Sequence, residues 1–384
     1  YPKAMTLGAI QNNDMIYKMG EEMARQFKEL DMHINFAPVV DVNSNPNNPV
    51  IGYRAFGENK EQVAQKSVAY MKGLQDNGVM ANAKHFPGHG DTEADSHYSL
   101  PVIKHSEEQM WNVDLYPYQK LFDQNLMSVM VAHLNVPSLD DVTGLPTSLS
   151  KPIVTDLLQD KMNFKGLVFT DALNMAGVAD LYPPGAVDLE ALLAGNDVLL
   201  FSQNVKKAKE LILAAVAEGR ISEQEIDRRI KKILKAKYWA GLNERKAIDT
   251  DKLMERLFTR ETEMLIENLY AEAITVATNK GSLVPFRQLD LKKFASLTIG
   301  GDGDEFQDYL SKYTQFDHFN ASKGAGQNSN EQIKKKLSNY DVIVVGLMGI
   351  SNSPGRKFGV NASDVKLIQE LSKEKQVVTV LFGN

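Results

Sequence analysis

Gly166-Leu167-Val168-Phe169-Thr170-Asp171 is the most strand-like run in the chain, and it ends in a carboxylate. Continuous apolar runs of this kind suit strands that are covered on both faces, as in a parallel sheet. The sequence therefore predicts a repeated strand–helix unit. Four further short apolar runs also end in polar residues and precede helical patterns: 34–40 before Asp41, 79–83 before Lys84 and His85, 127–132 before His133, and 197–201 before Ser202.

The spacing of these runs fits one unit per strand. The steps from Asp41 to His85, His133, Asp171 and Phe201 are 44, 48, 38 and 30 residues. A (β/α)8 barrel allots about 25 to 50 residues to each unit and carries its chemistry at the carboxyl ends of its strands. Five strands cannot close a barrel, and the first visible element, at about residues 13–30, is a helix. We therefore predict a (β/α)8 barrel domain over residues 1–245, with its first strand or strands before Tyr1.

The rest of the chain predicts a second α/β domain. Residues 246–273 read as a helical linker, and residues 274–384 alternate strand and helix patterns, which is typical of a doubly wound αβα sandwich. Gly300-Gly301-Asp302-Gly303 lacks the spacing of a dinucleotide-binding turn and is read as a plain turn. The predicted strands are 274–278, 295–300, 341–347 and 377–382, and the predicted helices are 305–313, 330–340 and 362–372.

Composition narrows the classes of function. With 384 residues, two domains are the default. The net charge of −6 argues against nucleic-acid or anionic-membrane partners, and no apolar stretch is long enough to span a bilayer. The absence of cysteine excludes disulfides and thiolate metal sites. Both ends, at Tyr1 and Asn384, read as cuts through a longer protein, and neither the compartment nor the oligomeric state is predicted.

A glycine-containing loop follows the second apolar run and holds three of the seven histidines. It reads Lys84-His85-Phe86-Pro87-Gly88-His89-Gly90-Asp91-Thr92-Glu93-Ala94-Asp95-Ser96-His97. Its glycines allow tight folding or swinging, so we predict a mobile loop that closes over a ligand. In an extended segment Asp95 and His97 lie on one side, where the carboxylate can fix the imidazole tautomer.

Asp171 is the second candidate for chemistry. At a strand end it would face Lys84 and His85, which would keep it ionised. An ionised aspartate with a protonatable histidine is what retaining glycoside cleavage needs, because one group attacks the anomeric carbon and the other protonates the leaving oxygen. The alternative is that Asp171 caps the following helix.

These residues carry a resemblance to a known family. Residues 84–90 with Asp95-Ser96-His97 resemble the signature of family 3 glycoside hydrolases of the bacterial β-N-acetylglucosaminidase type, and residues 51–57 and 169–173 are similar to two further family segments. The resemblance implies Asp171 as nucleophile and His97 as acid/base assisted by Asp95. It also implies that Arg54, Lys84 and His85 hydrogen-bond the sugar, and that an acidic D-x-E-G-G segment precedes Tyr1.

The substrate class implied is terminal β-linked N-acetylglucosamine on peptidoglycan fragments or chitooligosaccharides, without a cofactor. The alternatives are a β-glucosidase or β-xylosidase of the same fold, a metal-dependent hydrolase, and a non-catalytic glycan-binding remnant. His133 is taken as a sugar contact, with a core histidine as the alternative, and Asp41 as a residue that shapes the barrel rim.

Two further patterns are set aside. Ser148-Leu149-Ser150-Lys151 matches a serine acylase motif, but Pro152 and a helix follow, so Ser150 is read as a helix cap. A metal site built from His85, His89, Asp91 and His97 is not predicted, because Pro87 breaks the helix that i, i+4 ligands need.

Overall fold

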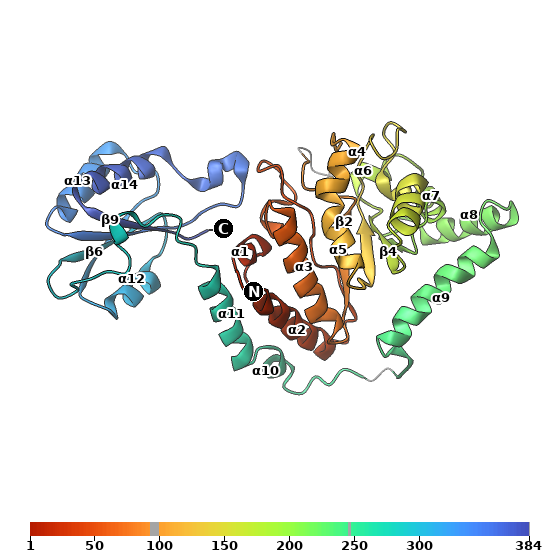
Figure 1. The fold of residues 1–384 in the computed structure, drawn as a ribbon, viewed down its shortest axis with the longest axis horizontal. Helices are drawn as coiled ribbons and strands as arrows, with labels where there is room; N and C mark the ends of the chain where they lie inside the picture. Colours follow the sequence, from red (N-terminus) through yellow and green to blue (C-terminus); the bar gives the residue numbers. More distant parts are fainter. Residues whose placement is uncertain (93–99, 245–246, 384) are drawn as a thin grey trace. The chain divides into compact units, whose positions relative to one another are not determined.

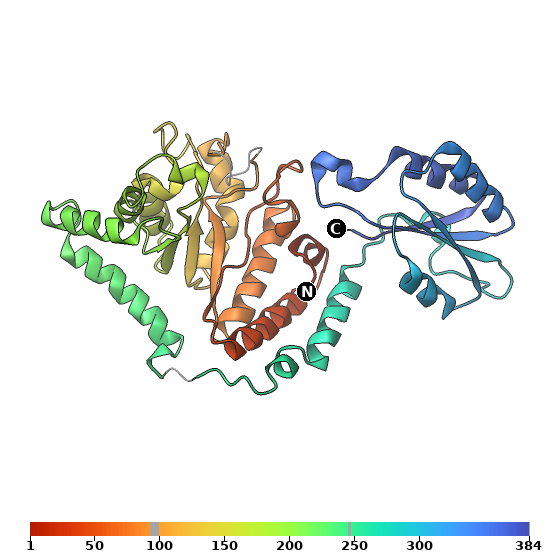
Figure 2. The ribbon, with the colours of Figure 1, turned by 180° about the vertical axis from the view of Figure 1, so that it is seen from behind.

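The computed structural model describes residues 1–92, 100–244 and 247–383. The chain forms two compact units, Tyr1–Ile274 and Thr275–Asn384. Figures 1 and 2 show the ribbon from opposite sides. In the part of the chain that is described, no helix is both long and apolar enough to cross a membrane.

The first unit contains a five-stranded parallel sheet in the order β1-β2-β3-β4-β5. An open parallel sheet of consecutive strands with helices between them confirms the predicted (β/α) barrel architecture. The strands are β1 Ile34–Asn35, β2 Met80–Phe86, β3 Ser128–Val131, β4 Leu167–Ala172 and β5 Val198–Leu200.

Helices connect the strands of this sheet, and several of them begin at a polar residue whose side chain accepts from a backbone amide. Ser150 accepts from the amide of Ile153 at 3.2 Å, which is the capping role expected of it. α2 and α3 lie side by side (Figures 1 and 2). The helices and helical turns are α1 Ala4–Gly8, α2 Asn13–Glu29, η1 Gly52–Arg54, α3 Lys60–Gln75, α4 Glu107–Gln109, η2 Met110–Asp114, α5 Tyr116–Phe122, η3 Thr147–Leu149, η4 Pro152–Lys161, α6 Ala176–Ala179, α7 Ala186–Ala194, α8 Val205–Ala217, α9 Glu223–Trp239, η5 Leu242–Glu244, α10 Leu253–Leu257 and α11 Arg260–Ala273.

The segment 246–273, expected to be a linker, carries α10 and α11. Leu269 of α11 is fully buried in the main core of the first unit, and α11 packs against α1 and α2. Helices α10 and α11 are separated at Phe258, and the side chain of Thr259 caps α11 by accepting from the amide of Thr262.

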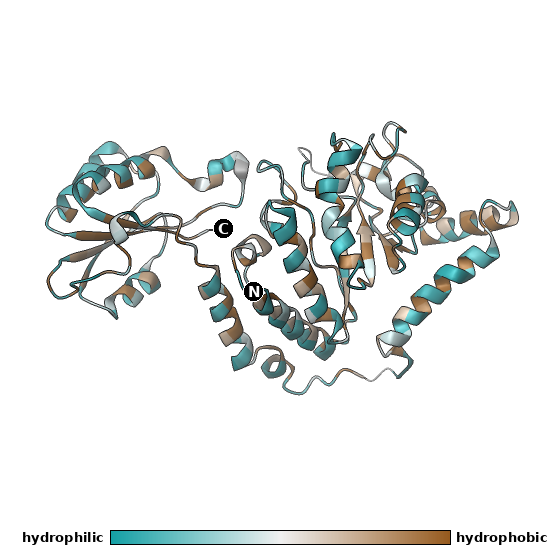
Figure 3. Cartoon of the chain, in the orientation of Figure 1, coloured by the Kyte–Doolittle hydropathy of each residue, from teal (hydrophilic) through white to brown (hydrophobic). Residues whose placement is uncertain are grey.

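The second unit is a four-stranded parallel sheet in the order β7-β6-β8-β9, which confirms the predicted αβα layering. One face of the sheet packs against α13 and α14, and the other packs against Phe306 and Leu310 of α12 (Figure 1). Figure 3 shows hydrophobic strands beneath largely hydrophilic helices. The elements are η6 Lys280–Ser282, β6 Phe294–Ile299, α12 Asp304–Ser311, β7 Phe316–Ala321, α13 Gln327–Leu337, β8 Val342–Leu347, η7 Pro354–Gly359, α14 Ala362–Glu374 and β9 Gln376–Leu381.

Two predicted strands need correction, and one strand was missed. The run 274–278 is not a strand, and Ile274 and Val276 are 77% and 66% exposed. Strand β7 was not predicted, because its exposed polar residues interrupt the apolar pattern. The run 34–40 contributes only the two residues of β1 and an isolated bridge from Val39 to Lys84, since Pro38 lacks the amide that a ladder needs.

Candidate functional site

Most of the predicted residues meet at the carboxyl edge of the first sheet. Lys84 and His85 lie at the end of β2, Asp171 lies at the end of β4, and His133 follows β3. Because the strands are parallel neighbours, their carboxyl ends share one edge of the sheet. Charge interactions link Asp171 to Lys84, His85 and His133, so these groups are close enough to influence each other's protonation.

Asp171 is held as a carboxylate. Its burial raises the pKa, but His85, His133, the amide of Ala172 and Lys84 together lower it further, so the net shift is downward. The Ala172 amide donates to Oδ1 at 2.8 Å. The next helix, α6, begins at Ala176 after Met175, so Asp171 does not cap it. The structure thus gives Asp171 a site in which an ionised carboxylate is stable.

Arg54 and Lys84 supply the positive charge around this site. Burial, and then repulsion by Arg54, lower the pKa of Lys84, while Asp171 and Asp41 oppose that shift. Arg54 ends the η1 turn, where its Nη1 donates to the carbonyl of Val50 at 3.1 Å. Its Nη2 lies 3.4 Å from Nε2 of His85. The predicted sugar ligands Arg54, Lys84 and His85 are therefore brought together.

Asp41 holds His85 in place, a contact that the sequence did not reveal. One carboxylate oxygen lies 2.8 Å from Nδ1 of His85, and the backbone amide of His89 donates to the other at 2.7 Å. The amide of His85 also points at this carboxylate, at 3.2 Å. Since a carboxylate only accepts, Nδ1 carries a proton and Nε2 faces Arg54. Asp41 thus fixes the tautomer of His85, which is more than the rim-shaping role expected of it.

The first part of the glycine-containing loop is tightly packed. A Cβ on Gly90 would lie 1.7 Å from the carbonyl oxygen of Val42, and one on Gly88 would lie 2.7 Å from Cβ of Asp114. Asn48 donates to the carbonyl of His89 at 2.8 Å. Burial lowers the pKa of His89 to about 4, so this imidazole is neutral near pH 7. These contacts hold residues 88–90 in place, while residues 93–97 of the loop lie outside the described residues, so the predicted closure of the loop stays a prediction.

His133 was predicted to contact the sugar. Its Nδ1 lies 2.7 Å from Oγ of Ser148, and its Nε2 lies 3.1 Å from the carbonyl oxygen of Ala172. Burial lowers the pKa of His133, so the ring is neutral, and only 1% of the residue is exposed. With both nitrogens engaged inside the protein, this arrangement favours a role in holding the end of β4. Its sugar contact stays a prediction.

Asp95 and His97, the predicted acid/base pair, lie outside the described residues, so their roles also stay predictions. Within the described ranges, no group of three or more side chains is arranged to hold a metal ion. Asp91, one of the residues considered for such a group, bonds His105 instead, with Oδ2 2.8 Å from Nε2.

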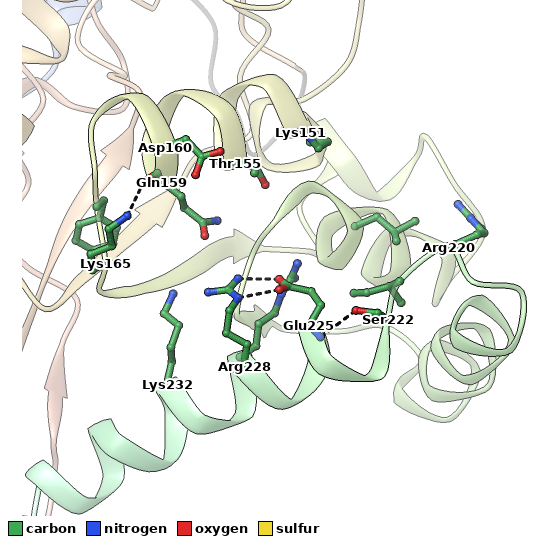
Figure 4. A pocket seen from close by; sticks show the side chains of 14 residues that line it. Lys151, Thr155, Gln159, Asp160, Lys165, Arg220, Ser222, Glu225, Arg228 and Lys232 are labelled. Atoms are coloured by element: carbon green, nitrogen blue, oxygen red, sulfur yellow. Dashed lines mark hydrogen bonds and ion pairs between the residues drawn. The ribbon is translucent and has the colours of Figure 1, made fainter.

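A hollow of about 540 Å³ lies between η4, the residues just before β4 and α9, away from Asp171 (Figure 4). Cationic side chains line it, but their charges are largely satisfied. Arg228 and Arg229 bond Glu225, and Lys232 lies 2.5 Å from Asp197. Lys165 and Lys232 stand near the amino ends of β4 and β5, the opposite strand ends from Asp171. In barrels of this type the amino face serves stability rather than chemistry.

Comparison with known proteins identifies the family. The model of the glycosyl hydrolase family 3 N terminal domain matches residues 1–236. The chain belongs to glycosyl hydrolase family 3. The family 3 resemblance expected from the loop and strand motifs is thereby confirmed.

Three relatives illustrate the likeness. Beta-hexosaminidase A of Pseudoalteromonas piscicida is 32% identical over 255 residues, which cover 61% of this chain and 43% of the relative. A β-N-acetylglucosaminidase/beta-glucosidase of Cellulomonas fimi is 30% identical over 247 residues, or 62% of this chain and 44% of the relative. A solved family 3 β-N-acetylglucosaminidase from Paenibacillus sp. str. FPU-7 superposes with a TM-score of 0.76 at 27% identity, covering 98% of this chain and 72% of the other. The chain spans less than half the length of the first two relatives.

Proposed function

We propose that this family 3 chain carries the active site of a retaining exo-glycosidase that removes terminal β-linked N-acetylglucosamine. The observation that carries the proposal is the partly buried, ionised carboxylate of Asp171 beside Lys84 and His85 at the carboxyl edge of a parallel sheet. The names of the β-hexosaminidase relatives support the substrate class. Peptidoglycan fragments and chitooligosaccharides are the proposed natural sources.

In the proposed reaction, Asp171 attacks the anomeric carbon while His97 protonates the glycosidic oxygen, and the leaving group departs. Water then attacks the glycosyl–Asp171 ester, with His97 taking its proton, so the β configuration is retained. The lowered pKa of Asp171 keeps the nucleophile ionised. Arg54, Lys84 and His85 would bind the sugar hydroxyls, since Lys84 and His85 act on the Asp171 carboxylate and Arg54 lies beside His85.

A histidine acid has a physical rationale. A neutral imidazole brings no negative charge near the acetamido oxygen of the substrate, whereas a glutamate would. Histidine also titrates near neutrality, so the rate should be greatest at about pH 6 to 7. An optimum well below about pH 5 would contradict this role for His97.

The test compares 4-nitrophenyl N-acetyl-β-glucosaminide with the matching β-glucoside on the full-length protein. We expect turnover of the N-acetylated substrate, loss of at least about 1,000-fold in Asp171→Asn, and azide rescue of His97→Ala on an activated substrate. Asp141→Asn, an exposed site in the same unit, is the matched control. Full activity in His97→Ala would place the acid elsewhere.

A β-glucosidase is the second candidate, because the relative from Cellulomonas fimi is named for both activities. Equal or faster turnover of the β-glucoside would favour it. Loss of turnover in EDTA would favour a metal-dependent hydrolase, and binding without turnover would indicate a glycan-binding remnant.

A further inference from the structure

His105 lies outside the residues discussed as the active site, yet it is buried between two carboxylates. Its Nε2 is 2.8 Å from Oδ2 of Asp91, and its Nδ1 is 2.8 Å from Oδ2 of Asp114. His105 is only 8% exposed, and the side chain of Asp114 is 1% exposed. We call these three side chains the His105 clamp.

The geometry of the His105 clamp sets the charge of its imidazole. Burial raises the pKa of Asp114, while the hydrogen bond to His105 opposes that shift. With both aspartates ionised, each accepts hydrogen bonds and donates none, so each ring nitrogen must carry a proton to bond its partner. Both nitrogens carry protons only in the imidazolium form. The bond to Asp114 accordingly raises the pKa of His105, although burial opposes the shift. A charged histidine is the form that fits between the two aspartates.

The His105 clamp joins three separate segments of the first unit. Asp91 belongs to the loop after β2, and Asp114 ends the η2 turn. His105 follows a short stretch that runs beside the segment after β3, where the amide of Ile103 donates to the carbonyl of Asn135 at 2.9 Å. Each segment is therefore held at this point by charge as well as by packing.

Asp114 of the His105 clamp is connected to His85 through the turn at Gly88. The turn at Gly88 packs on Asp114, because a Cβ on that glycine would lie 2.7 Å from Cβ of Asp114. The amide of Gly88 donates to the carbonyl of His85 at 2.8 Å, and the amide of His89 donates to Asp41. A shift of Asp114 would therefore move the turn that sets the position of the His85 ring.

We propose that His105 is a positioning residue for the glycosidase site, because it ties Asp91 to Asp114 and so holds the turn that orients His85. The proposal rests on the proposed function for its effect on catalysis, but its effect on the His85 ring is independent of the substrate. His105 acts through this turn and does not itself contact the sugar.

The charge of His105 makes the arrangement sensitive to pH. Among the described residues, the titratable groups that act on the His105 clamp are its own two carboxylates, the carboxylate of Asp41, whose charge acts on Asp114, and the buried phenol of Tyr118. Because the pKa of His105 is raised in the folded protein, its stabilising contribution is complete below the unfolded value of about 6.5. That contribution is lost as the pH rises through the folded pKa.

The experiment uses His105→Gln in the full-length protein, with His318→Gln as control. His318 lies in the second unit and bonds only to serines among the described residues, Ser296 and Ser311. Histidine ring resonances and the kinetics of 4-nitrophenyl N-acetyl-β-glucosaminide are measured together. We expect kcat to fall by roughly 10- to 100-fold with a smaller change in KM, since a misplaced site loses about that much. The alkaline limb of the pH profile should change, and the His85 and His89 resonances should shift.

Unchanged kcat together with unchanged His85 and His89 resonances in His105→Gln would overturn the proposal. If His105→Gln fails to fold, Asp91→Asn serves in its place, because that side chain is 33% exposed and only one carboxylate is neutralised. If the wild-type protein cleaves neither glycoside, the proposed function fails, and the His85 and His89 resonances alone decide whether His105 positions the ring.

Discussion

Replacing Asp41 with asparagine should destabilise the first unit and slow the reaction together. Asp41 is 1% exposed and receives donors from the His85 ring, the His85 amide and the His89 amide. An asparagine keeps one acceptor oxygen, but its NH2 group replaces the other oxygen and places a donor where an acceptor is needed. At least one buried donor is then left without an acceptor.

The cost follows from these contacts. A hydrogen bond to a charged group contributes about 1.5 to 3 kcal/mol, and leaving one buried donor unpaired costs about 1 to 3 kcal/mol. Since part of the bonding survives in Asp41→Asn, we expect a loss of about 2 to 4 kcal/mol in the free energy of unfolding. For a unit of this size that corresponds to roughly 5 to 15 °C in Tm. The kcat/KM should fall by about 10- to 100-fold, because His85 loses its fixed tautomer and position.

The pH dependence gives an independent check. Burial raises the pKa of Asp41, but His85 and His89 lower it further, so the folded value lies below the ordinary one. The contribution of the charge is therefore present above the unfolded pKa of about 3.9 and is lost as the pH falls through the folded pKa. The difference between wild type and Asp41→Asn should stay constant from about pH 7 to 5 and narrow below about pH 4.

Thermal unfolding followed by circular dichroism measures the effect, with Asp141→Asn as an exposed control in the same unit. If Asp41→Asn unfolds at the same temperature as wild type and the control, the three donors are not held by this carboxylate and the reasoning is refuted. A loss of stability with full kcat/KM would separate the two effects and remove Asp41 from the active site.

Two further substitutions test the packing of the first unit. Gly90→Ala should destabilise it by more than about 3 kcal/mol in urea unfolding, because the new Cβ would lie 1.7 Å from the Val42 carbonyl oxygen. Gly326→Ala, which has open space around it, is the control and should cost about 1 kcal/mol or less. Equal losses of stability in the two variants would contradict the close approach at Gly90. Lys232→Met should cost about 3 to 5 kcal/mol, because it leaves the buried Asp197 without its partner at 2.5 Å, and adding Asp197→Asn should restore part of the loss. A Tm for Lys232→Met within a degree of wild type would show that water already solvates Asp197.

Complete burial marks β3 and the start of β4 in the sequence, whereas β5 and β9 were predicted from their apolar runs although neither is fully buried. The residues of β3 and the first four of β4 are all buried, so an uninterrupted apolar run marks each of them. Strand β7 is paired on only one side, and the exposed Asp317 and His318 break its pattern. The run 274–278 is as apolar as a strand but pairs with no neighbour among the described residues. An apolar run therefore indicates a strand only when the fold supplies a partner.

The residues of the candidate site also fall into a group that the sequence predicts and a group that it does not. Lys84, His85 and Asp171 follow directly from their positions at strand ends, because parallel strands bring those ends to one edge. The bond from Asp41 to His85 spans 44 residues and the bond from Asp91 to His105 depends on how two loops return, so neither is visible as a sequence pattern. Loop residues that recognise other loop residues are fixed by tertiary packing, and a single sequence contains no periodic signal for them.

The structure distinguishes the carboxylate of Asp41, which is buried, from that of Asp171, which is partly exposed. Asp41 and Asp171 both follow apolar runs, and both have a lowered pKa that His85 helps to maintain. The oxygens of Asp41 are taken up by three donors, which makes them poor nucleophiles. Among the described residues, Asp171 accepts a hydrogen bond only from the Ala172 amide, so its second oxygen keeps its lone pairs for a ligand. This difference in occupancy supports the proposal that Asp171 attacks the sugar while Asp41 holds His85.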